Sequence, residues 1–129
     1  MNLLPDTQLL LWAAESPTGP RIREAAALMG NPANIIHFSA ASIWEVAIKF
    51  AQGRADFKFE PRVLRRALID NGYLELPITS KHGAAVAGLP PVHKDPFDRL
   101  LVAQAMTEGF ILLTTDAILA RYPGPIRVF

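Results

Sequence analysis

Short apolar stretches alternate along this chain with longer segments whose apolar residues recur at helical spacing. The stretches expected to form strands are residues 2–5, 34–38, 73–78, 110–114 and 126–129. The segments expected to form helices are residues 7–15, 19–30, 40–52, 61–70, 80–89 and 96–108, with a short helical piece after residue 116. Strands separated by helices predict a three-layer, Rossmann-like α/β fold, in which helices flank a five-stranded, mainly parallel sheet.

Capping residues support two of these helices. Ser39 is a natural N-cap for the helix over 40–52, and Gly53 stands where that helix should end. Asp95 is a good N-cap for the helix over 96–108, because Pro96 suits the first helical position and Asp98 lies at the positive end of the helix dipole. Capping alone would therefore explain both aspartates, unless other carboxylates converge on the same place.

Composition excludes several classes of site. The chain has 129 residues, which fits a single domain spanning 1–129. No apolar run reaches the roughly eighteen residues that a bilayer span requires, and the start does not resemble a signal peptide, so the expected compartment is the cytoplasm. The chain contains no cysteine, and His37, His82 and His93 show no metal-ligand spacing, so any metal should be held by oxygen. A net charge of +1 neither supports nor excludes RNA binding.

Several acidic residues map to one edge of the predicted sheet. Asp6 follows the first strand and Asp116 follows the fourth, so both should lie at the carboxyl ends of parallel strands. A helix that follows a strand begins at this edge, which brings Glu45 within a turn or two of it. The helix opened by Asp95 runs antiparallel to its strand, so Asp98 should arrive at the same edge.

Such a cluster of carboxylates requires protons or a cation. Two like charges about 4 Å apart repel by roughly 4 kcal/mol at an effective dielectric constant near 20. Mg²⁺ and Mn²⁺ take carboxylate oxygens and can serve the in-line hydrolysis of a phosphodiester. The chain has no Ser/His/Asp arrangement and no glycine-rich phosphate loop to suggest another chemistry.

The segments that carry these acids resemble those of the PIN-domain ribonucleases, and more narrowly the VapC-like toxins of bacterial toxin–antitoxin pairs. The match runs from end to end of the chain through LLPDTQLLLW, SAASIWEVAIK, LPPVHKDPFDRLLVAQAMTEG and ILLTTDAILARY. The resemblance implies a PIN-like fold, an acidic pocket with Mg²⁺ or Mn²⁺, and endonucleolytic cleavage of RNA. It also implies a homodimer and inhibition by a VapB-like antitoxin.

Carried over residue by residue, the catalytic and metal-binding acids are Asp6, Glu45, Asp98 and Asp116. The sequence departs from the family pattern at Pro5, where an aliphatic residue is usual, and at Gln8, where histidine is frequent. Neither departure removes a metal ligand, but Pro5 cannot donate a strand hydrogen bond and puts the end of the first strand in doubt.

Three further residues are candidates for supporting roles, namely Asp95, Thr115 and Arg99. Thr7, Thr114 and Thr115 flank the acids and are candidates to orient them, although ordinary capping explains these hydroxyls equally well. Arg99 is a candidate to steady Asp98 or meet a phosphate, with a solvated arginine as the default interpretation.

The chain contains two tryptophans, Trp12 and Trp44. Both stand at helical spacing among aliphatic residues and are expected in the core, rather than as anchors for an antitoxin helix.

Two rival functions remain to be weighed against the toxin. One rival function is a catalytically weak PIN-like module that binds RNA or a protein partner. The other, phosphoryl transfer through a covalent aspartate at Asp6, is disfavoured because no second aspartate follows at Asp-x-Asp spacing.

Overall fold

The computed structural model describes residues 1–15 and 19–129. The strands are β1 (Asn2–Pro5), β2 (Ile35–Ser39), β3 (Leu74–Leu76), β4 (Ile111–Thr114) and β5 (Ile126–Val128). The helices are α1 (Thr7–Glu15), α2 (Pro20–Gly30), α3 (Ala40–Ala51), α4 (Pro61–Asp70), α5 (Ser80–Val86) and α6 (Pro96–Glu108), with a 3₁₀ helix η1 (Ala117–Arg121).

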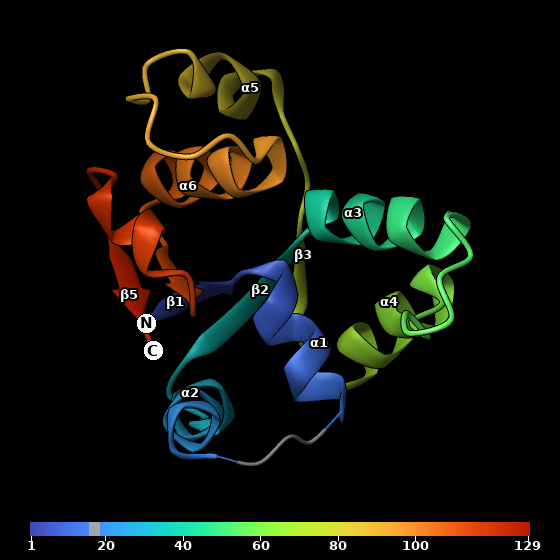
Figure 1. Cartoon of the computed structure of the whole chain (residues 1–129). Coiled ribbons are helices and arrows are strands. Elements are labelled where there is room, and N and C mark those ends of the chain that lie inside the picture. Colours follow the sequence, from blue (N-terminus) through green and yellow to red (C-terminus); the bar gives the residue numbers. More distant parts are fainter. Residues whose placement is uncertain (16–18) are drawn as a thin grey trace.

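The strands form one sheet in the order β3-β2-β1-β4-β5, and every neighbouring pair is parallel. In Figure 1, α5 and α6 lie on one side of this sheet, with α1 and α2 on the other. The predicted fold class is therefore confirmed. Because the order reverses direction at β1, the carboxyl ends of β1, β2 and β4 lie side by side at the place where ligands bind in such sheets.

Alternate residues of the strands divide the core between the two faces. Leu4 and Leu112 pack against α6, in a cluster that includes the buried Leu101. Leu3 and Leu113 pack against α1 and α2, where Met29 belongs to the same cluster. Strands covered on both faces need apolar residues at consecutive positions, which explains why β1 and β4 read as continuous apolar runs.

A third cluster joins α1, α3 and α4 around Phe38 of β2. Its members are Leu10, Leu11, Phe38, Val46, Leu64 and Leu68, all buried. These contacts fix α3 against the central part of the fold, so the side chains of its first two turns are held in place relative to the end of β1.

Pro5 does not shorten β1. The strand pairs with β4 through Pro5, and the backbone N–H of Asp6 continues the ladder by donating to Leu113 O at 2.8 Å. Backbone groups of successive residues point to opposite sides of a strand, so the nitrogen of Pro5 faces β2. Registered pairing between β1 and β2 ends at Leu3, and the amide that proline lacks is not needed there.

The predicted caps are confirmed, while some element ends differ from the prediction. Ser39 Oγ accepts from Ala41 N at 3.0 Å at the start of α3, and Asp95 caps α6. Strand β3 is shorter than the expected 73–78 because it stops before Pro77. Helix α5 ends at Val86 rather than at residue 89, and the chain continues in turns, where Ala87 N donates to Ala84 O and Gly88 N donates to Ala85 O.

Candidate metal and active site

Asp6 lies directly beyond β1 with only 5% of its surface exposed. Its Oδ1 accepts from the backbone N of Leu9 at 3.0 Å, and its Oδ2 accepts from Thr114 Oγ1 at 2.6 Å. Burial raises the pKa of the Asp6 carboxyl, these two hydrogen bonds lower it, and the nearby Glu45 and Asp116 raise it further. The side chain is thus held rigidly in a place that disfavours its charge.

Glu45 comes from the second turn of α3 and is also buried. Lys49, one turn further along the helix, lies 3.1 Å from Glu45 Oε2. The other oxygen, Oε1, is fully buried and has no hydrogen-bond partner within residues 1–15 and 19–129. A buried carboxylate oxygen without a partner carries a free-energy cost that a ligand at this position would remove.

The opening residues of α6 contribute two acids with different environments. Asp95 Oδ1 accepts from the backbone N of Phe97 at 2.8 Å and of Asp98 at 3.3 Å, so this side chain is committed to capping. Asp98 points elsewhere, and its pKa is raised to about 7 by burial first, then by Asp95, Asp6 and Glu45. His93 opposes this shift.

Asp116 lies beyond β4 and caps η1. Its Oδ1 accepts from the backbone N of Ile118 at 3.0 Å, and its Oδ2 lies 3.0 Å from His93 Nε2. Ligand atoms of His93, Asp98 and Asp116 all fall within 4.8 Å of one another. This spacing is compatible with a shared cation.

The structure therefore brings together the four acids predicted from the sequence. Asp6 is coupled electrostatically to Glu45 and Asp116, and Asp98 is coupled to Asp6 and Glu45. All four lie around the carboxyl ends of β1, β2 and β4. A group of carboxylates that raise one another's pKa in a largely buried place is suited to binding a cation.

The family model of the PIN domain matches residues 3–125 of the chain. The chain belongs to the PIN domain family. No curated protein is significantly similar to it in sequence. Family membership supports assignment as a nuclease, and hence as a hydrolase.

Solved structures with the same fold include toxin–antitoxin complexes. They include VapBC2 from Rickettsia felis bound to a DNA fragment from its promoter, with a TM-score of 0.72 and 14% identity, covering 99% of this chain and 98% of that one. DNA-bound VapBC from Salmonella typhimurium has a TM-score of 0.65 and 16% identity, covering 100% of this chain and 97% of that one. VapBC-1 from nontypeable Haemophilus influenzae has a TM-score of 0.62 and 16% identity, covering 94% and 91%. At these identities, the likeness establishes that the PIN domain here has the fold found in those complexes.

The supporting residues differ in part from those expected. Thr114, rather than Thr115, contacts the acids: its hydroxyl donates to Asp6 and accepts from the backbone N of Asp116 at 3.0 Å. The described contact of Thr115 is made by its carbonyl oxygen, which accepts from Arg21. Arg99 donates to Pro90 O at 3.0 Å and to Val86 O at 3.3 Å, so it holds the loop before α6 and is not simply solvated.

Two residues near the acids were missed by the sequence analysis. His93 has no ligand spacing in the sequence, but the loop before α6 carries it between Asp98 and Asp116. Trp44, expected in the core, is 59% exposed, so that prediction is wrong. It stands next to Glu45 on α3 and meets Phe97 of α6 edge to face, with ring centroids 5.3 Å apart.

The reason for the error at Trp44 lies in the orientation of α3. Its buried residues are Ala41, Ser42, Glu45 and Val46. The helix turns two polar side chains inward to serve the site, where Thr7 Oγ1 donates to Ser42 Oγ at 2.9 Å. The apolar Trp44 and Ile48 are consequently left on the outer surface.

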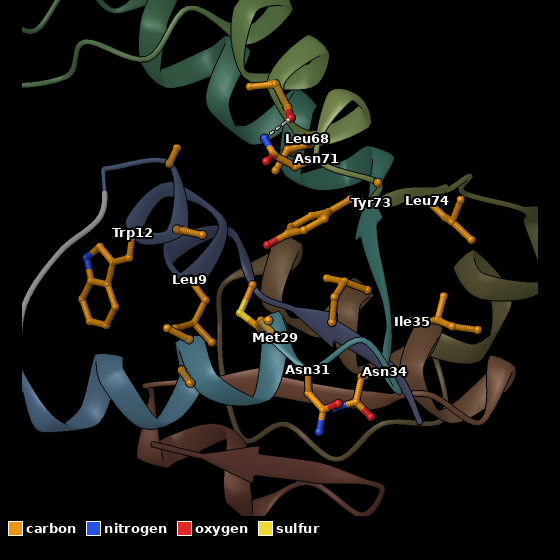
Figure 2. A pocket seen from close by; sticks show the side chains of 18 of the residues that line it. Leu9, Trp12, Met29, Asn31, Asn34, Ile35, Leu68, Asn71, Tyr73 and Leu74 are labelled. Atoms are coloured by element: carbon orange, nitrogen blue, oxygen red, sulfur yellow. Dashed lines mark hydrogen bonds between the residues drawn. The ribbon is translucent and has the colours of Figure 1, made fainter.

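Figure 2 shows a second hollow, at the amino ends of β2 and β3. This groove of about 880 Å³ lies between α1, α2 and α4, and its lining includes Leu9, Trp12, Met29, Leu68 and Tyr73. Trp12 packs against the cluster under α2, as the core prediction requires, but it also forms one wall of the groove. The PIN domain thus has a cluster of four acids, called the acidic pocket below, at one edge of its sheet and an apolar groove at the other.

Within the described residues, no helix is both long and apolar enough to cross a membrane.

Proposed function

We propose that this PIN domain is a Mg²⁺- or Mn²⁺-dependent endoribonuclease that acts as the toxin of a toxin–antitoxin pair. The observation that carries the proposal is the buried Oε1 of Glu45, which has no partner in the described part of the chain although Glu45 is close enough to Asp6 and Asp98 to raise the pKa of both. A fold builds such an arrangement at a cost in stability, and a bound cation would offset that cost.

The four acids fit a hard divalent cation. All of their donors are oxygens, and the pKa values of Asp6 and Asp98 are raised, as expected for carboxylates that lack a counterion. Asp6, Glu45, Asp98 and Asp116 would hold the ion. A bound ion would lower the pKa of a water molecule at the site and would stabilise negative charge on a phosphate.

The remaining chemistry of the site rests on how the chain positions these carboxylates. Leu9 N and Thr114 Oγ1 fix both oxygens of Asp6, and Lys49 fixes one oxygen of Glu45. Asp95 caps α6 and so places Asp98 one turn into the helix. Carboxylates held in this way need little rearrangement when a substrate arrives.

An aromatic pair beside the acids, the exposed Trp44 and the partly buried Phe97, supports single-stranded RNA as the substrate. Trp44 forms an edge-to-face pair with Phe97. Phe97 lines a shallow hollow of about 520 Å³, together with Glu45 and the exposed Lys94. Unpaired bases stack on aromatic rings, and lysine meets the phosphates of a single strand. The choice of RNA as the substrate comes from the family resemblance, and the aromatic and basic side chains of this surface are suited to binding it.

We propose that the antitoxin binds in the apolar groove. A groove of this size between α1, α2 and α4 suits the apolar face of an amphipathic segment of a partner protein. The three solved structures named above are complexes of VapBC, which supports a VapB-like inhibitor. We also infer a homodimer from the family resemblance, which light scattering would test against the chain mass of 14.1 kDa.

The deciding experiment uses purified, antitoxin-free protein and total RNA. Cleavage should require Mg²⁺ or Mn²⁺, stop with EDTA, and be absent from the Asp6→Asn variant at equal concentration. Circular dichroism should show that this variant remains folded. Induced expression of the wild type, but not of Asp6→Asn, should arrest growth.

The same experiment distinguishes the rival function of a catalytically weak binding module. A protein of that kind would bind RNA or a partner without releasing cut fragments under any metal condition. Failure to cleave total RNA, with the fold intact and manganese shown to bind, would favour this alternative.

A further inference from the structure

His93 lies between two of the proposed metal-binding acids and belongs to no predicted site. Its Nε2 is 3.0 Å from Asp116 Oδ2 and 3.6 Å from Asp98 Oδ2. A histidine in this position has two possible roles toward a cation. It can be a nitrogen ligand, or it can be a hydrogen-bond donor that orients the carboxylates.

The other ring nitrogen decides between these roles. His93 Nδ1 lies 3.0 Å from the backbone N of Asp95, and a backbone amide can only donate. Nδ1 must therefore accept, so the neutral ring carries its proton on Nε2. This proton points toward the carboxylate of Asp116.

The backbone of His93 is held as firmly as its ring. Its N–H donates to the hydroxyl of Tyr122 at 2.9 Å, and the same hydroxyl accepts from Arg99 Nη1 at 3.0 Å. Tyr122 is only 4% exposed and follows η1, the helix that Asp116 caps. The loop before α6 and the segment after β4 are thus interlocked on both sides of the His93–Asp116 contact.

A metal bond at Nε2 conflicts with this arrangement. A histidine that ligates a metal usually donates its second ring N–H to a carbonyl or carboxylate. Here the second nitrogen faces a donor, so ligation by Nε2 would require a ring without any proton. We propose that His93 is a positioning residue: its Nε2–H holds Asp116, within reach of Asp98, while the cation is bound by oxygen atoms alone.

The hydrogen bond from His93 completes the orientation of Asp116. One carboxylate oxygen accepts from the backbone N of Ile118, and the other accepts from His93. Each oxygen keeps a lone pair for a cation, while the carboxylate can no longer rotate freely. This role rests on the proposed metal site, because it concerns how one acid is presented to the ion.

Two substitutions separate the functions of the two ring nitrogens. In His93→Gln, the terminal amide reaches the position of Nε2 and can donate to Asp116. In His93→Asn, the terminal amide reaches only the position of Nδ1, where its oxygen can accept from Asp95 N. Mn²⁺ affinity, measured by electron paramagnetic resonance titration, should fall by about 10-fold or more in the asparagine variant and stay within about 3-fold of wild type in the glutamine variant. Equal losses in the two variants, or no loss in either, would overturn the assigned role.

Two measurements on the wild type do not depend on the folding of a variant. Electron spin echo spectra of the Mn²⁺-loaded protein should show no coupling to imidazole nitrogen, and ¹⁵N spectra of the histidine rings should place the His93 proton on Nε2. Nitrogen coupling that disappears in His93→Asn, or a proton found on Nδ1, would refute the inference. Absence of Mn²⁺ binding would instead contradict the proposed function, while the ring tautomer would still be measured.

Discussion

The acidic pocket and the apolar groove lie at opposite edges of the same sheet and are unfavourable in water for opposite reasons. In the pocket, burial raises the pKa of Asp6 and Asp98, and one oxygen of Glu45 lacks a partner in the described part of the chain. In the groove, Trp12 and its neighbours expose apolar surface. The carboxylates of the pocket would be stabilised by a cation, and the exposed apolar surface of the groove would be stabilised by an apolar partner. Each surface thus indicates the class of its ligand.

The largest expected effect comes from removing one acid of the pocket. Glu45→Gln keeps the size of the side chain but weakens cation binding, so RNA cleavage should fall by at least about 100-fold in a fluorescent substrate assay. Binding of the antitoxin should be unchanged in calorimetry, because the groove is formed by other elements. A parallel loss of both activities would show that the two edges are not independent.

The converse change blocks the groove. Ala67 is an exposed residue of α4 in the groove lining, and Ala67→Arg places a long charged side chain where the apolar partner should lie. Antitoxin affinity should fall by about 10-fold or more, while RNA cleavage by the free protein continues. Ala84→Arg, on the exposed surface of α5 outside the groove, is the matched control and should bind normally.

A smaller effect should follow from Trp44→Ala, which tests whether the exposed aromatic pair belongs to the pocket. Loss of one stacking surface should raise KM for RNA by about 5-fold, with kcat less affected, since stacking contributes roughly 1–3 kcal/mol per base. Antitoxin affinity should not change. If antitoxin affinity falls instead while KM stays constant, the pair belongs to a protein interface.

The smallest effect concerns the stability of the metal-free protein. The pKa of Asp98 is raised from 3.8 to about 7, so between these pH values the folded carboxyl keeps a proton that the unfolded chain releases. This contribution stabilises the fold at low pH and is lost as the pH rises toward 7. In EDTA, Tm should therefore fall over this range, and Asp98→Asn should raise Tm at neutral pH by roughly 3 °C, or about 1 kcal/mol. Added Mg²⁺ should raise the Tm of the wild type but not that of the variant.

The convergence of Asp6, Asp98 and Asp116 was predictable because each position follows from a local rule. Asp6 and Asp116 directly follow apolar strands, and Asp98 lies one turn after a capping aspartate and a proline. Parallel strand order then implies a common edge. The caps and the pattern of helices were accessible for the same reason, since they depend on residues close together in the sequence.

His93 and Trp44 were beyond sequence reasoning for physical reasons. The position of His93 is set by Tyr122, which comes from a distant part of the chain and accepts from both His93 N and Arg99 Nη1. Trp44 was misplaced because α3 buries Ser42 and Glu45, so the hydrophobic pattern of this helix does not describe its buried side. The groove depends on the spacing of α1, α2 and α4, which no local pattern encodes.

The position of β1 has a consequence for the synthesis of the protein. This central strand begins near the first residue, but its neighbour β4 begins only at Ile111. A nascent or truncated chain that stops before Ile111 lacks both the second edge for β1 and the acid at Asp116. The ribosome must therefore release the segments of both β1 and β4 before the pocket can close, which keeps the proposed nuclease inactive while the residues between these strands are still being made.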